Sequence, residues 1–302
     1  MLENCAWCPR ECHVNRLKGE LGYCRSDAGL NIGSICIHRG EEPVISGEKG
    51  ICNIFFTNCN LQCVYCQNYQ ISDNTSDRSD QDLTLEETVK NVVRILENGI
   101  NRVGFVSPSH FIPQMLMIIE SVRSLGFRPV WVYNSNGYDK VTTLRMLEGI
   151  IDVYLPDFKY SDSSLGAALS DAHDYPKVAG NALKEMFRQK GSTLILDENR
   201  NAESGMVVRH LVLPGAVENS IQVLRFLAEE LSPRIHVSLM AQYYPTPRVC
   251  NHPQLGRRVT SKEYREVISA MEKLGMHHGW IQEFDSSDFY RPDFNRDHPF
   301  EL

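Results

Sequence analysis

Short apolar runs alternate with longer amphipathic stretches along most of the chain. From residue 52 onward the apolar runs are rich in β-branched and aromatic residues, which is typical of strands buried in a parallel sheet. This pattern predicts six strands, at residues 52–57, 102–106, 128–133, 150–155, 205–213 and 234–240. A helical period between and after them predicts helices at residues 84–98, 110–125, 139–148, 174–190, 218–231 and 260–274.

The first of these helices begins with a capping box of Thr84 and Glu87, in which each side chain satisfies a backbone N–H of the other residue. Strands that alternate with helices run parallel and are joined by right-handed crossovers. We therefore expect an α/β fold, a partial (β/α)6 TIM-like barrel whose chemistry lies at the carboxyl ends of its strands. An open doubly wound sheet is the alternative. The polar residues 68–82 are expected to form an irregular linker.

The first 50 residues have a different composition, rich in Cys, Gly and Arg, with one strand-like piece at residues 30–38. No helical period is visible there. We therefore expect two regions, a small N-terminal Cys-rich extension stapled by metal over residues 1–50 and a barrel domain over residues 51–302.

The chain has 302 residues, of which 42% are apolar and 23% are charged, and these values exclude a disordered chain. Its net charge of −7 gives no overall positive field, so a nucleic-acid partner is not expected. The N-terminus lacks the apolar run of a signal peptide, and no stretch reaches the ~18 apolar residues of a membrane helix. We therefore expect a cytoplasmic protein with no membrane partner.

The cysteines are concentrated near the N-terminus. Nine of the ten lie between Cys5 and Cys66, and only Cys250 lies beyond them. In a long chain without a secretion signal, such clustering favours metal binding over disulfides. Cys36 and Cys52 lie on strand-like segments and are expected to be buried apolar residues rather than ligands.

Four of these cysteines have the spacing C-x2-C-x3-C-x11-C and are Cys5, Cys8, Cys12 and Cys24. Four thiolates suit tetrahedral zinc or a closed iron–sulfur cluster, and the spacing does not distinguish the two. Either metal can hold together a segment too small to fold alone.

Three further cysteines follow the first barrel strand at C-x3-C-x2-C spacing, Cys59, Cys63 and Cys66. A closed four-iron cluster takes four cysteine ligands, so three would leave one iron with an open position. Half of a zinc site, or a set of buried thiols, is the alternative.

This triplet, with the aromatic Tyr65 before its last cysteine, resembles the radical S-adenosylmethionine (SAM) superfamily. Within it, residues 38–50, 59–68 and 153–160 are similar to the pyruvate formate-lyase activating enzyme-like group. The resemblance implies a [4Fe-4S] cluster whose unique iron binds SAM through its amino and carboxylate groups. One-electron reduction then gives a 5′-deoxyadenosyl radical that abstracts hydrogen from a substrate.

The resemblance also implies partners: an electron donor such as flavodoxin or ferredoxin, and a glycyl radical enzyme as the target. A small molecule or a nucleotide is the alternative substrate. A metal-stapled binding or scaffold protein without catalysis is the rival function, and the intact triplet argues against it. No catalytic residue is expected beyond the cluster ligands.

The expected strand ends offer polar side chains to SAM. Many superfamily members carry a Gly-Gly-Glu-Pro-like stretch after the second strand, but here residues 106–110 read VSPSH, without a carboxylate. Ser107 is therefore expected to lie beside SAM at this position, but the resemblance does not give it the contact that the Glu makes. Ser135 and Asn136 can hydrogen-bond the ribose hydroxyls; an ordinary strand-to-helix turn is the alternative, because Asn and Gly are the usual turn residues. His110 is expected either to be solvated or to contact the substrate.

Two further strand ends carry charge. The resemblance to an Asp-x-Lys segment implies that Asp157 and Lys159 face the cofactor, a surface ion pair being the alternative. Arg209 lies within an apolar strand and needs an anion, either the SAM carboxylate or a neighbouring acid such as Asp157. His210 would point to the opposite face, outside the barrel.

Overall fold

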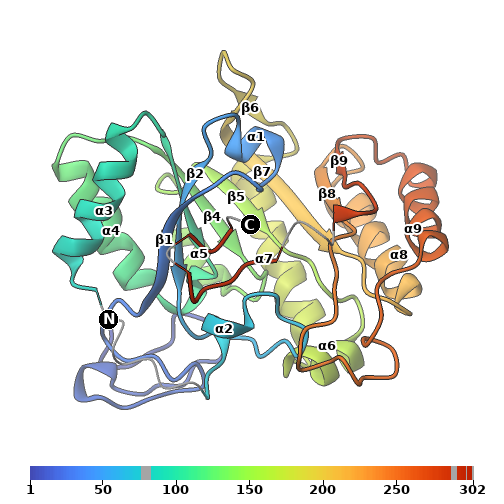
Figure 1. Ribbon diagram of the computed structural model, residues 1–302, viewed down its shortest axis with the longest axis horizontal. Helices are drawn as coiled ribbons and strands as arrows, with labels where there is room; N and C mark the ends of the chain where they lie inside the picture. The colour runs from blue at the N-terminus through green and yellow to red at the C-terminus, as the bar shows by residue number, and fades with distance from the viewer. Residues whose placement is uncertain (76–82, 287–290, 297, 301–302) are drawn as a thin grey trace.

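The computed structural model describes residues 1–75, 83–286, 291–296 and 298–300 (Figure 1). Over these residues the chain forms a nine-stranded sheet in the order β1-β2-β3-β4-β5-β7-β8-β9, with β6 paired to β7. The strands are β1 Ile32–His38, β2 Ile51–Phe56, β3 Arg102–Val106, β4 Val130–Ser135, β5 Val153–Pro156, β6 Ile195–Leu196, β7 Ala202–Leu211, β8 His236–Met240 and β9 Gly279–Ile281.

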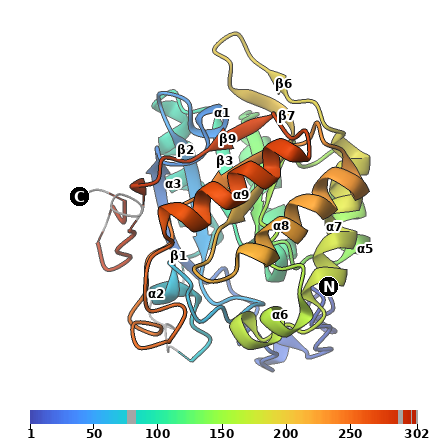
Figure 2. The same ribbon diagram turned by 90° about the vertical axis from the view of Figure 1, so that its right-hand side faces the viewer.

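Helices cover the outer side of this curved sheet (Figures 1 and 2). The α-helices are α1 Pro43–Ser46, α2 Tyr69–Ser72, α3 Leu85–Glu97, α4 Ile112–Ser124, α5 Val141–Met146, α6 Ser163–Ser170, α7 Tyr175–Lys190, α8 Val217–Phe226 and α9 Ser261–Lys273. Short turns of 3-10 helix, η1 Arg16–Lys18 and η3 Pro108–His110, and a π turn, η4 Leu227–Leu231, complete the described elements.

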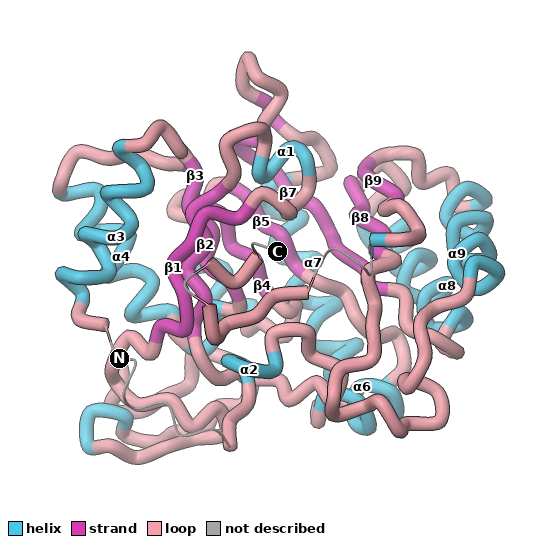
Figure 3. The backbone as a smooth tube through the Cα atoms, viewed as in Figure 1, coloured by secondary structure: helices cyan, strands magenta, loops and turns pink. Residues whose placement is uncertain are grey.

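The strands from β2 to β5, and then β7, β8 and β9, run parallel, whereas β1 joins β2 in the antiparallel sense. The expected partial TIM-like barrel is therefore confirmed, with β1 and β9 at its two ends. Figure 3 shows the loops gathered at the carboxyl ends of the parallel strands, around α2 and α6.

Burial explains why the apolar runs became strands. Every residue of β2, β3 and β5 is buried, as expected for parallel strands covered on both faces. Helix α3 begins as predicted, with the Thr84 hydroxyl accepting from the Glu87 amide (3.2 Å) and the Glu87 carboxylate accepting from the Thr84 amide (2.9 Å).

Several predicted boundaries were wrong for local reasons. Strand β4 begins after Pro129, which lacks a donor for the ladder, and extends to Ser135 because Asn134 and Ser135 pair with the neighbouring strands. Strand β7 starts earlier, at Ala202, since it forms a hairpin with β6. The predicted linker contains the short helix α2, and residues 76–82 lie outside the described residues.

The division at residue 50 stays a prediction. Strand β1 belongs to the expected extension, yet it pairs along its length with β2 of the expected barrel domain. Over the residues that the structure describes, no helix is long and apolar enough to cross a membrane.

Candidate active site

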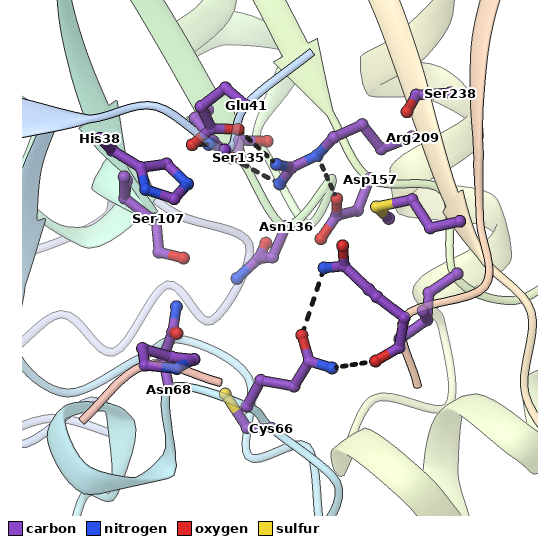
Figure 4. A pocket seen from close by; sticks show the side chains of 18 of the residues that line it. His38, Glu41, Cys66, Asn68, Ser107, Ser135, Asn136, Asp157, Arg209 and Ser238 are labelled. Atoms are coloured by element: carbon purple, nitrogen blue, oxygen red, sulfur yellow. Dashed lines mark hydrogen bonds and ion pairs between the residues drawn. The ribbon is translucent and has the colours of Figure 1, made fainter. Parts of the chain in front are cut away.

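A cavity of about 460 Å³ opens inside the barrel. The triplet cysteines and all six residues proposed to contact SAM line it: Cys59, Cys63, Cys66, Ser107, Ser135, Asn136, Asp157, Lys159 and Arg209. Figure 4 shows Cys66 at one end of this cavity and His38, Glu41 and Arg209 toward the other. The fold thus gathers side chains from five strand ends into one space.

Each cysteine of the triplet has a hydrogen-bond donor directed at its sulfur. The Ser170 hydroxyl donates to Cys63 Sγ (2.9 Å), and the Ser72 hydroxyl donates to Cys66 Sγ (3.2 Å). Cys59 Sγ accepts from the Asn136 amide (3.4 Å) and from the Leu61 backbone N–H (3.4 Å). Such donors stabilise the charge of a thiolate, so this donor set fits a metal-bound state.

Two of these thiols, those of Cys59 and Cys63, are hard to ionise in their buried positions. Burial raises the pKa of Cys59 to about 12. Burial also raises the pKa of Cys63 to about 11, although the nearby Lys159 ammonium partly opposes that shift. A bound cluster would replace the protons with iron, as metal binding to thiols generally does.

The cysteine loop is anchored from three directions. The Cys59 backbone N–H donates to Asn74 Oδ1 (2.9 Å), and Asn74 in turn donates to the Tyr23 carbonyl (3.0 Å). Asn60 donates to the Tyr138 carbonyl (2.9 Å), and its own carbonyl accepts from Arg10 Nε (2.9 Å). Sequence reasoning missed these anchors because Asn and Arg at such positions have no distinctive spacing.

Asn136 and Ser135 are engaged by the protein itself. Asn136 donates to Asn60 Oδ1 (2.7 Å) as well as to Cys59, and the Ser135 hydroxyl donates to Asp139. Between them and the next strand, Gly137 has φ +80°, and a Cβ there would lie 2.1 Å from the Asp157 carbonyl oxygen. Glycine is therefore required for this turn to pack against β5.

Asp157 joins two cations. Lys159 Nζ donates to its Oδ2 (2.5 Å), and Arg209 Nε donates to its Oδ1 (2.9 Å). Burial opposes ionisation, but Arg209 and Lys159 outweigh it and hold the pKa of Asp157 below its usual value. The ion pair to Asp157 that the sequence offered for Arg209 is present, and Arg209 Nη2 also donates to Asn134 Oδ1 (2.6 Å).

The cavity also contains a carboxylate that does not come from a strand end. Glu41, between β1 and α1, reaches into the cavity, where its Oε2 accepts from Arg209 Nη1 (3.2 Å) and its Oε1 from Asn53 (2.9 Å). The neighbouring Glu42 also lines the cavity. The HRGEEP stretch contains both residues, but it precedes the barrel strands, so a search of strand ends does not find them.

Two histidines lie away from the cavity. His210 is buried outside the barrel as expected, with its ring nitrogens 2.7 Å from the Phe158 carbonyl and 2.8 Å from the Ser220 hydroxyl. The expectation that His110 is solvated was wrong, since it is 1% exposed with Nε2 3.1 Å from the Thr57 carbonyl. It does not line the large cavity but a smaller one, next to the N-terminal cysteines.

That second cavity, of about 10 Å³, is lined by Cys5, Cys8, Cys12 and Cys24. Arg10, Arg16 and His110 face it as well, and the Tyr23 backbone N–H donates to Cys12 Sγ (3.2 Å). Cys36 and Cys52 are buried elsewhere, as expected. Over the described part of the chain, no group of three or more His, Cys, Asp or Glu side chains has the geometry to hold a metal ion as it stands.

Comparison with known proteins supports the cluster assignment. A family model described as a 4Fe-4S single cluster domain matches residues 45–169, which include the cysteine triplet. An uncharacterized protein of Methanocaldococcus jannaschii is 29% identical over 280 residues, covering 91% of this chain and 76% of that protein.

Solved structures show the same fold. The FeFe-hydrogenase maturase HydG from Carboxydothermus hydrogenoformans matches with a TM-score of 0.53 at 15% identity, over 76% of this chain and 52% of that chain. Streptococcus suis SuiB, bound to its precursor peptide SuiA, matches with a TM-score of 0.50 at 14% identity, over 77% and 49%. The chain thus spans about half the length of these two proteins. These likenesses show that the chain shares its partial-barrel fold with both proteins, as the sequence predicted.

Proposed function

We propose that this chain is a radical SAM enzyme, in which Cys59, Cys63 and Cys66 hold a [4Fe-4S] cluster and SAM occupies the adjoining cavity. The observation that carries this proposal is the triplet itself, because each sulfur accepts a hydrogen bond and all three line a cavity of about 460 Å³. When bound, the cluster would supply the one-electron reduction that splits SAM into methionine and a 5′-deoxyadenosyl radical.

The protein's own residues position the reactants. Ser107 and Lys159, which line the cavity from the ends of β3 and β5, are the groups proposed to contact SAM directly. Ser135 and Asn136 can reach the ribose only by exchanging their present partners, Asp139 and Asn60.

For Arg209 and Asp157 the geometry favours a positioning role. Arg209 already donates to Asp157, Glu41 and Asn134, so the SAM carboxylate would have to displace one of these acceptors. We infer that this network keeps Lys159 directed toward the cavity and near Cys63, since Asp157 pairs with Lys159 as well.

The finer parts of the proposal are the target and the additional metal. Similarity of residues 38–50, 59–68 and 153–160 to activating enzymes supports a glycyl radical enzyme as target, with flavodoxin or ferredoxin as the electron donor. A small-molecule or nucleotide target fits the same cavity. The four N-terminal cysteines support bound zinc or an auxiliary iron–sulfur cluster. Arg16 Nη2 lies beside them without a hydrogen-bond partner among the described residues, and the negative thiolates of a metal site would pair with it.

Anaerobic reconstitution tests the proposal. The reconstituted protein should contain four irons and four sulfides for the triplet site, in addition to any metal at the N-terminal cysteines. With dithionite and SAM it should then form 5′-deoxyadenosine. Reconstituted protein that binds the cluster yet forms none would leave the rival scaffold function standing.

A further inference from the structure

The large cavity has two chemically different ends. His38 pairs with Ile51 at the start of β2, whereas Cys59 lies three residues beyond the end of that strand at Phe56. At ~3.3 Å per residue, the two ends of β2 are roughly 16 Å apart. The cysteines therefore occupy one end of the cavity, and the segment from His38 to Glu42 approaches the other (Figure 4).

This remote end contains two buried polar atoms without partners. Glu42 is 8% exposed and its Oε2 has no hydrogen-bond partner among the described residues. His38 is 7% exposed, and its Nδ1 also has none within the described part of the chain. Buried polar atoms nearly always have partners because desolvation without a hydrogen bond is costly. Both residues line the large cavity, which indicates a ligand that can pair with a carboxylate oxygen and a ring nitrogen.

The charges nearby specify the kind of donor. Glu41 and Asp157 are paired with Arg209, and Asp157 also with Lys159, so these two acids and two bases balance. Glu42 is the remaining buried carboxyl group among the described residues that line the cavity, since Glu283 is exposed. Burial raises the pKa of Glu42, although Arg209 opposes that shift, so the surrounding protein disfavours the charged form. A cationic ligand would supply the missing charge, and the Trp280 ring, which also lines the cavity, attracts cations.

We propose that the substrate carries a cationic nitrogen group, an ammonium or a guanidinium, that binds to Glu42 and His38 at the end of the cavity remote from the cysteines. The proposal rests on the proposed function, because SAM held at the cluster keeps its own amine at the opposite end. The substrate would then extend from Glu42 toward SAM, which places the hydrogen to be abstracted between the two ends.

The test compares two probes of similar shape, butylguanidinium and its neutral analogue N-butylurea. Both are titrated calorimetrically into reconstituted, SAM-loaded protein without reductant. We expect the cation to bind about tenfold more tightly, because charge-assisted hydrogen bonds are stronger than neutral ones. Glu42→Gln should remove this preference, whereas Glu48→Gln, which changes an exposed acid just after α1, should keep it.

Equal binding of the two probes, or a preference that survives Glu42→Gln, would overturn the proposal. A fall in SAM affinity in Glu42→Gln would also overturn it, because the SAM amine would then be the occupant. If Glu42→Gln does not fold, His38→Gln is the second variant, and it should weaken butylguanidinium severalfold more than N-butylurea. Failure of the wild type to form 5′-deoxyadenosine would instead sink the proposed function, whatever the probes show.

Discussion

The chain carries two sets of cysteines, and they differ in what faces their sulfur atoms. Cys59, Cys63 and Cys66 open onto a cavity of about 460 Å³ whose walls carry polar strand ends. Cys5, Cys8, Cys12 and Cys24 surround only about 10 Å³, closed by buried side chains such as Arg16 and His110. Three ligands beside an open space favour a reactive centre, and four ligands around a closed one favour a structural centre.

Removing one cysteine of the triplet should have the largest effect on cluster content and activity. Cys63→Ala leaves two thiolates, which cannot hold a four-iron cluster, so we expect loss of the cluster and of all 5′-deoxyadenosine formation. Iron and sulfide analysis with the dithionite assay measures both. Cys250→Ala, which removes an exposed cysteine outside both sets, is the matched control. A Cys63→Ala protein with wild-type iron content and activity would show that the site is misassigned.

The ion pairs that Asp157 makes in the large cavity can be removed without changing a cysteine. Asp157→Asn leaves Arg209 and Lys159 without their shared anion, and because these side chains are partly buried the loss should reach up to about 3 kcal/mol. Urea unfolding measures this loss. Glu230→Gln, which removes the exposed pair with Lys184, should change stability by less than about 1 kcal/mol. Equal effects of the two substitutions would contradict the buried network.

The lowered pKa of Asp157 also predicts that its contribution to the free energy of unfolding depends on pH. Because the pKa of Asp157 is lowered in the folded state, its contribution is present above the unfolded value of about 3.9 and is lost as the pH falls through the folded pKa. The stability difference between wild type and Asp157→Asn should therefore be full at pH 6 and shrink below about pH 4. A constant difference across this range would show that Asp157 is not ionised in the folded protein.

Substitution in the N-terminal set of four cysteines should lower the stability of the protein and leave its reaction unchanged. Cys8→Ser removes one of four ligands, and we expect a melting temperature lower by ~4 °C, since ~2 kcal/mol shifts a protein of this size by that much. The triplet cluster should still assemble, because the two ligand sets do not overlap. Unchanged metal content and melting temperature would refute the N-terminal metal, and loss of the triplet's spectrum in folded protein would show coupling through Arg10 and Asn74.

Arg209→Lys should have the smallest effect. An ammonium cannot reproduce the three directions in which the guanidinium donates, so we expect about 1 kcal/mol of lost stability in a thermal melt. Calorimetric titration of SAM distinguishes the two roles offered for this residue. Weaker SAM binding at an unchanged melting temperature would assign Arg209 to the SAM carboxylate instead.

Sequence alone predicted the parts of the molecule that depend on local pattern. The parallel strands, the α3 capping box and the cysteine triplet follow from hydrophobic period and spacing. Glu41 and Glu42 could not be found in this way, because β1 pairs antiparallel with β2 and brings them into the barrel from outside the strand-helix repeat. His110 meets the N-terminal cysteines only through tertiary packing, which periodicity does not encode.

The two outer strands of the sheet have a mechanical consequence. In a fully closed barrel, the number and stagger of the strands fix the circumference. In the part of this chain that the structure describes, β1 and β9 pair with only one neighbour each, so a seam runs between them. The ring can widen there without breaking a backbone hydrogen bond between strands. The circumference of the barrel is therefore set by side-chain packing along the seam, not by a closed ladder of backbone hydrogen bonds.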